Sequence, residues 1–205
     1  MADLKRFELN RPEYGIYMNE LAFGGTAINT IGFLLRFPTV SPETLRAAAD
    51  RVIAAVPIFG LAFDEKAPCL IAMDRREKCA IGIAMSPDEA AAAWETLAES
   101  PMGGKTYAFC VGALTGGGSY LTARFHHIIL DGYDMCKLAR RILDELAGTP
   151  TADAGPLTRY VPPEPDAAAF TASMLMMPSR RLRKSAPRQG RRWYPWFSRA
   201  PWPAG

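Results

Sequence analysis

The stretch RFHHIILDG, residues 124 to 132, contains both histidines of this chain, followed by an aspartate and a glycine. The residues that lead into it, SYLTARF, include two aromatic residues and one β-branched residue, types that favour a strand. The residues that follow it, YDMCKLARRILDELAG, repeat apolar side chains three and four positions apart, which predicts a helix. The two histidines therefore lie where a strand gives way to a loop and a helix, a place where side chains are often presented to a substrate.

The chemistry of these residue types suits proton transfer. An imidazole can accept a proton near neutral pH, because its ordinary pKa is about 6.5. Neighbouring side chains on a strand point to opposite faces, so only one of His126 and His127 is expected to face a reaction centre. Asp131 can orient the loop through hydrogen bonds, and Gly132 allows another molecule to approach the backbone closely. Two adjacent histidines alone are more often a surface pair or satisfied core side chains, so the hypothesis depends on the whole pattern.

Strands and helices alternate along the rest of the chain, which favours an α/β fold with helices covering a sheet. Ser41 precedes a proline and an amphipathic segment, and Ser86 and Glu89 have the spacing of a capping box, so a helix is expected to begin at each serine. Gly148 is the expected end of the helix after the motif. The charged turn RREK suggests a hairpin between the strands on either side of it. The expected strands are 26–38, 69–74, 79–85, 105–113 and 119–130, and the hairpin joins the second to the third.

The composition of the chain indicates which class of protein it belongs to and where it is located. Of the 205 residues, 49% are hydrophobic and 22% are charged, as in ordinary globular domains. The four cysteines show no CxxC spacing, which indicates neither a zinc site nor a disulfide framework. No apolar run reaches the length of about 18 residues that a membrane span needs, and the N-terminus is too polar for a secretory signal. We therefore expect a cytoplasmic protein without a membrane partner.

The last 26 residues, 180–205, differ from the rest of the chain. They contain eight of its 24 basic residues, none of its 21 acidic residues and three of its four tryptophans. Basic and aromatic residues together can bind RNA or an anionic surface. A single short run is weak support for such binding, so a linker or an extension that packs on its own domain is the favoured interpretation, and no nucleic-acid partner is expected.

The segment His126-His127-Ile128-Ile129-Leu130-Asp131-Gly132 matches the HHxxxDG signature of the acyltransferases related to chloramphenicol acetyltransferase, which include the condensation domains of nonribosomal peptide synthetases. PEYGIYMNELAFGGTAINTIGFLLRF resembles the opening helix and first strand of a condensation domain, and SPETLRAAADRVIAAVPIFGLAF resembles the helix and turn that follow. The motif lies at mid-chain here, whereas single-lobe members of the superfamily have it near the C-terminus. The resemblance, over about residues 11–148, therefore favours the condensation branch.

This resemblance implies a fold and a domain division. The fold would be an α/β, chloramphenicol acetyltransferase-like two-layer sandwich, one lobe only, with a mixed sheet covered by helices. Residues 1–160 would form the N-terminal lobe of a condensation domain. Residues 161–205 would form a short helix and the basic tail rich in tryptophan and proline.

The resemblance also assigns roles to the motif residues. The second histidine of the family, here His127, deprotonates or positions the attacking amine. His126 and Asp131 would maintain the loop, the aspartate through an arginine. Gly132 would let the acyl donor approach and lend a backbone N–H to the oxyanion. The candidates for the arginine are Arg36 and Arg124.

Two classes of function stay open. In the first, the chain is the N-terminal half of an acyltransferase of secondary metabolism that works with acyl or peptidyl carrier proteins and needs a second lobe or a homo-oligomer. Its substrates would be carried on phosphopantetheine or coenzyme A, with no metal or bound redox cofactor. In the second, the chain is a non-catalytic remnant or a carrier-binding module. The first class is favoured, because a remnant could lose His127 or Gly132 at little cost to folding.

Overall fold

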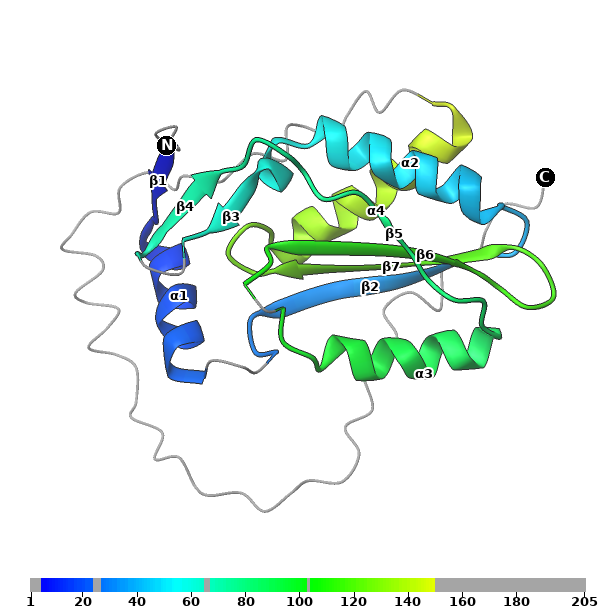
Figure 1. Ribbon diagram of the computed structural model, residues 1–205, viewed down its shortest axis with the longest axis horizontal. Helices are drawn as coiled ribbons and strands as arrows, with labels where there is room; N and C mark the ends of the chain where they lie inside the picture. Colours follow the sequence, from blue (N-terminus) through cyan, green and yellow to red (C-terminus); the bar gives the residue numbers. More distant parts are fainter. Residues whose placement is uncertain (1–4, 24–26, 65–66, 103, 150–205) are drawn as a thin grey trace, which may run out of the picture. The chain divides into compact units, whose positions relative to one another are not determined.

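The computed structural model describes residues 5–23, 27–64, 67–102 and 104–149 (Figure 1). The expected boundary near residue 160 and the expected short helix and tail lie outside these residues. The described strands are β1 (Arg6–Glu8), β2 (Thr30–Phe37), β3 (Leu61–Phe63), β4 (Cys69–Ala72), β5 (Ala80–Ile81), β6 (Tyr107–Ala113) and β7 (Ser119–His126). The described helices are α1 (Arg11–Phe23), α2 (Pro42–Ala55), α3 (Pro87–Ala98) and α4 (Gly132–Ala147), with a 3-10 helix, η1, at Pro57–Gly60.

A four-stranded mixed sheet forms the centre of the fold, in the order β2-β7-β6-β5. The strand that carries the motif, β7, lies between β2 and β6 and is antiparallel to both, whereas the short edge strand β5 runs parallel to β6. A smaller antiparallel sheet has the order β1-β4-β3. The α/β class with a mixed sheet covered by helices is therefore confirmed.

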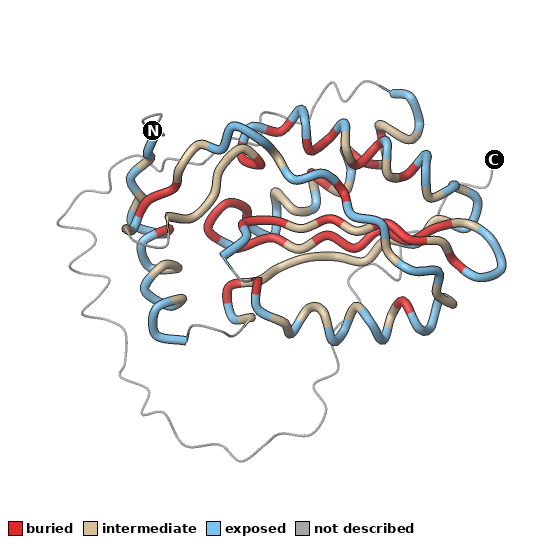
Figure 2. The backbone as a smooth tube through the Cα atoms, viewed as in Figure 1, coloured by how far each residue is buried: buried red, intermediate tan, exposed pale blue. Residues whose placement is uncertain are grey.

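Alternate residues of β7 face two different layers of helices. Leu121, Ala123 and Phe125 belong to the main core, which α2 and α4 cover, whereas Tyr120 packs on the opposite side with Ala90 of α3. Figure 1 shows α2 and α4 on one side of the sheet and α3 on the other. In Figure 2 buried residues follow β6 and β7 along most of their length. The motif strand is thus packed on both of its faces.

Local signals in the sequence located the helix ends correctly. The Ser41 side chain accepts a hydrogen bond from the N–H of Thr44 at the start of α2. Ser86 and Glu89 form the predicted capping box at the start of α3. Gly148 ends α4 with a left-handed backbone, at a φ of 65°, which glycine adopts without the steric cost that a side chain brings.

The predicted hairpin between 69–74 and 79–85 is wrong. β4 pairs with β1 and β3 in the small sheet, whereas β5 pairs with β6 in the large one. The charged segment between them does not close a hairpin, and its Arg76 side chain donates hydrogen bonds to the carbonyl oxygens of Ile53 and Ala54 at the end of α2. The segment therefore carries the chain from one sheet to the other.

Candidate functional site

The motif strand ends at His126, four positions before the predicted end at Leu130. The Nδ1 atom of His126 accepts a hydrogen bond from the N–H of Ile128 at 3.2 Å, and its carbonyl oxygen accepts one from the N–H of Ile129 at 3.1 Å. These bonds close a turn immediately after the strand. Ile128, Ile129 and Leu130 are buried in the main core beneath this turn, so their apolar character reflects a buried loop and not a longer strand.

The two histidines of the motif have opposite environments. His126 is 4% exposed, and the Phe63 ring of β3 meets its imidazole nearly edge-on, with 4.9 Å between the ring centroids. His127 is exposed, although its backbone N–H donates to the carbonyl oxygen of Asn29 at 2.7 Å. The fold thus separates the pair in the expected sense, with the second imidazole accessible and the first enclosed.

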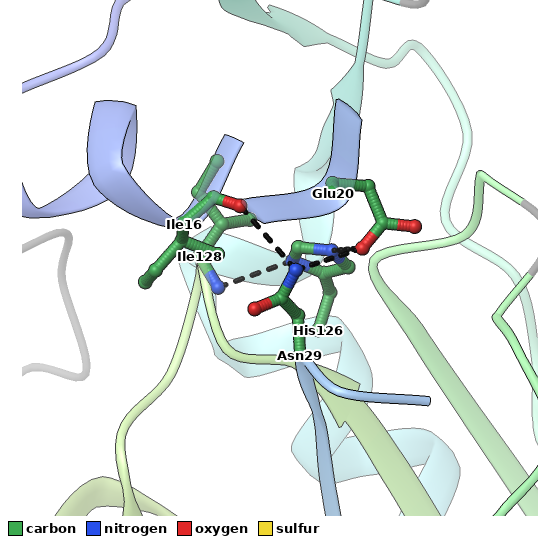
Figure 3. Close-up of polar contacts among 5 residues, drawn as sticks. All are labelled: Ile16, Glu20, Asn29, His126 and Ile128. Atoms are coloured by element: carbon green, nitrogen blue, oxygen red, sulfur yellow. Dashed lines mark hydrogen bonds and ion pairs between the residues drawn. The ribbon is translucent and has the colours of Figure 1, made fainter. Parts of the chain in front are cut away.

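A small polar cluster surrounds the His126 imidazole (Figure 3). The Nε2 atom of His126 lies 3.4 Å from Oε2 of Glu20 in α1, and the same oxygen accepts a hydrogen bond from Nδ2 of Asn29 at 2.8 Å. Because Nδ1 of His126 accepts from the N–H of Ile128, the neutral ring must hold its proton on Nε2, facing the carboxylate. Burial lowers the pKa of His126, and the neighbouring Glu20 charge opposes this effect only in part.

Asp131 and Gly132 form the start of α4. The Oδ1 atom of Asp131 accepts a hydrogen bond from the N–H of Asp134 at 2.8 Å, which makes Asp131 the N-cap of the helix. Gly132 is exposed, and a methyl group added at its Cα would meet no described heavy atom within 4 Å apart from its chain neighbours and its own helix backbone. The backbone at the end of the motif is therefore open to another molecule on this side.

The expected arginine partner of Asp131 is not found among the described residues. Arg124 is directed toward α3, where its Nη1 donates to the carbonyl oxygens of Leu97 and Ser100 at 2.6 and 3.0 Å. Burial lowers the pKa of this guanidinium. Arg36, the other candidate, is exposed on β2. Within the described part of the chain, capping of α4 accounts for the placement of Asp131.

Other features of the described surface do not coincide with the motif. One hollow, of about 370 Å³, is lined by Arg75 to Lys78, and another, of about 340 Å³, lies between α2 and Ile81. Among the described residues, no group of three or more histidine, cysteine or acidic side chains could hold a metal ion. No helix in the same residues has the length and apolar character needed to cross a membrane.

Glu20 and Asn29 are the site residues that sequence reasoning missed. Glu20 lies within the segment that resembles an opening helix, and Asn29 lies within the range expected to be a strand. Neither has a local spacing that relates it to residue 126. An acidic residue near a helix end and an amide at a strand start were visible, but only the folded arrangement of α1, β2 and β7 brings them to the histidine.

Comparison with known proteins relates this geometry to one class of fold. The starter condensation domain of the rhizomide synthetase RzmA is 18% identical, with a TM-score of 0.59, over 73% of this chain and 41% of its own. A mutant of that domain in complex with C8-CoA and Leu-SNAC also has a TM-score of 0.59. The first condensation domain of the CDA synthetase is 16% identical, with a TM-score of 0.56, over 69% of this chain and 39% of its own.

The chain therefore has the fold of a condensation-domain lobe and spans about two fifths of the length of these solved domains. No family model and no curated protein matches its sequence. The likeness is thus carried by the three-dimensional arrangement of the elements.

The buried His126 predicts a pH dependence of stability. Its pKa is lowered in the folded state, so below about pH 6.5 the unfolded chain takes up a proton that the folded chain resists. The contribution of the neutral His126 ring to the free energy of unfolding is complete above about pH 6.5. It is lost as the pH falls toward the lowered pKa of the folded state. His126→Asn, whose Oδ1 can still accept from the N–H of Ile128, should therefore lose less free energy of unfolding than the wild type between about pH 7.5 and about pH 5.5.

Urea unfolding of both proteins at the two pH values measures this difference. Equal losses of unfolding free energy would show that His126 does not contribute to the pH dependence.

Proposed function

We propose that the chain is the N-terminal half of a condensation-type acyltransferase, which transfers an acyl or peptidyl group from a carrier-bound or coenzyme A thioester to an amine or hydroxyl acceptor. The observation that carries this proposal is an accessible His127 beside an enclosed His126, at the end of the central strand of a condensation-domain fold. The C8-CoA and Leu-SNAC bound to a mutant of the RzmA domain support this substrate class.

In the proposed reaction, the acceptor nitrogen attacks the thioester carbonyl carbon while the His127 imidazole takes its proton. A C–N bond forms and a tetrahedral oxyanion develops, toward which the backbone N–H of Gly132 is proposed to point. The C–S bond then breaks, and the leaving thiolate takes the proton from His127. The products are an amide and a free thiol, so atoms and charge balance without a cofactor.

Because His127 is exposed, we propose that a second protein surface forms the other wall of the reaction site. His127 is exposed on the described part of the chain, and neither of the two hollows named above includes a motif residue. Holding two reactants in place contributes up to about 7–11 kcal/mol to an acyl transfer. We propose that a second condensation lobe, or another copy of the chain, supplies that wall, and that carrier proteins deliver the substrates.

The role of His127 is tested with the full chain, alone and together with a second condensation lobe. We call the combination of the two the completed assembly. An acyl-CoA and an aminoacyl thioester serve as substrates, and amide formation is followed by mass spectrometry. The isolated monomer should form little amide, whereas the completed assembly should be active. His127→Ala should lower that activity by roughly 100- to 10,000-fold, the usual contribution of a positioned acid or base.

The exposed Glu95→Ala on α3 is the control and should keep full activity. Amide formation at equal rates by the wild type and His127→Ala would contradict the catalytic role. Efficient turnover by a monomer would overturn the need for a second wall, and inactivity in every combination would support a non-catalytic carrier-binding module.

The Gly132→Ala variant distinguishes a role of Gly132 in the reaction from a role in packing. The added methyl meets open space at the first position of α4, so the free energy of unfolding should stay equal or rise by up to about 1 kcal/mol. Activity of the completed assembly should fall at least about tenfold, because the methyl occupies space through which the acyl donor is proposed to approach.

Gly15→Ala in α1 is the matched control, because a methyl group there also meets nothing within 4 Å and the residue is distant from the motif in sequence. It should preserve activity. Wild-type activity in Gly132→Ala would remove the donor-approach role of this glycine.

A further inference from the structure

Three separate elements converge on the turn that presents His127. Glu20 comes from α1, Asn29 directly precedes β2, and His126 ends β7 (Figure 3). Asn29 is 5% exposed, and its side-chain amide donates to both Glu20 Oε2 at 2.8 Å and the carbonyl oxygen of Ile16 at 3.3 Å. Both contacts lie on α1, so this buried amide ties the start of β2 to that helix.

The backbone of Asn29 in turn holds His127. Thr30 and His126 form the last pair of the β2–β7 ladder, and the carbonyl oxygen of Asn29 accepts the N–H of His127 at 2.7 Å, one step beyond it. The main chain of His127 is therefore fixed by a residue whose own side chain is anchored to α1.

The imidazole of His126 fixes the other side of the turn. Its Nδ1 accepts the N–H of Ile128, the residue after His127, and its Nε2 lies 3.4 Å from Glu20 Oε2. The Phe63 ring limits rotation of the imidazole by its edge contact. Both nitrogens are thus engaged, and a single carboxylate oxygen serves the ring and the Asn29 amide together.

We infer that Glu20 and Asn29 are positioning residues for His127, acting through the His126 ring and the Asn29 carbonyl, and this inference rests on the proposed acyltransferase function. Glu20 does not touch the proposed reaction centre. It restrains the Asn29 amide and the His126 ring, so that the exposed imidazole of His127 extends from a fixed backbone. An apolar residue at position 20 could fill the same space, but it would leave the Asn29 amide and the His126 Nε2–H without this acceptor.

Four variants of the full chain test the inference: Glu20→Gln, Glu20→Ala, Asn29→Ala and Asn19→Ala. Glutamine retains an oxygen that can accept from Asn29 or His126 but lacks the charge, whereas alanine lacks both. Asn19 is exposed on α1 next to Glu20 and is the matched control. Amide hydrogen exchange and ¹⁵N spectra of the two imidazoles are the primary measurements, and neither needs an active enzyme.

In Glu20→Ala and Asn29→Ala, exchange at the His127 and Ile128 amides should accelerate at least about tenfold, because one anchor of the turn is lost. Exchange in the middle of β7, at residues 121–123, should stay as in the wild type. Glu20→Gln should restore protection of the turn yet lower the pKa of His126, since the Glu20 charge favours the protonated ring. Asn19→Ala should match the wild type throughout.

Wild-type protection at both turn amides in Glu20→Ala would overturn the inference. If that variant does not fold, Glu20→Gln decides the point, since an unchanged His126 pKa would show that the carboxylate does not act on the ring. In the completed assembly, Glu20→Ala should lower kcat by about 10- to 100-fold with little change in KM, and Glu20→Gln should recover most of it. If Glu20→Ala loses protection of the turn amides from exchange but the wild-type assembly forms no amide, the anchoring role of Glu20 is upheld. The proposed acyltransferase function is then refuted.

Discussion

The enclosure of the His126 ring is the interaction on which the rest of the site depends. Its Nδ1 atom accepts the N–H of Ile128, a bond that stabilises the turn directly after the end of β7. The turn brings the apolar residues 128–130 into the core and leaves His127 outside. One buried side chain thus contributes a hydrogen bond to the turn that separates the enclosed histidine from the exposed one.

The surrounding fold makes this strand end rigid. β7 is hydrogen-bonded on both sides, and helices pack on both of its faces. Arg124 adds a side-chain link from β7 to the carbonyl end of α3, and the capping bond of Asp131 starts α4 directly after the motif. Because each link uses a different element, the motif loop is held from several directions, as a precise reaction site requires.

The sequence was informative where the deciding chemistry is local. Ser41, Ser86 and Gly148 cap their helices with neighbouring residues, so their roles could be predicted from spacing alone. The hairpin prediction failed because β4 and β5 pair with strands that are distant in the sequence, and the Arg76 between them contacts the end of α2, more than 20 positions away. The same limit hid the Glu20–His126 contact, which joins residues 106 positions apart. Alternation predicted only that the two histidines face different surroundings, whereas the turn after His126, which leaves His127 exposed, required the structure.

The fold divides two adjacent, chemically identical side chains into an enclosed one and an exposed one. Chemical modification of the native chain by diethyl pyrocarbonate, mapped by mass spectrometry of its peptides, tests this division most directly. We expect rapid modification of His127, whereas His126, which is 4% exposed, should react only after the chain is unfolded. Equal modification of both histidines in the native protein, or faster modification of His126, would contradict it.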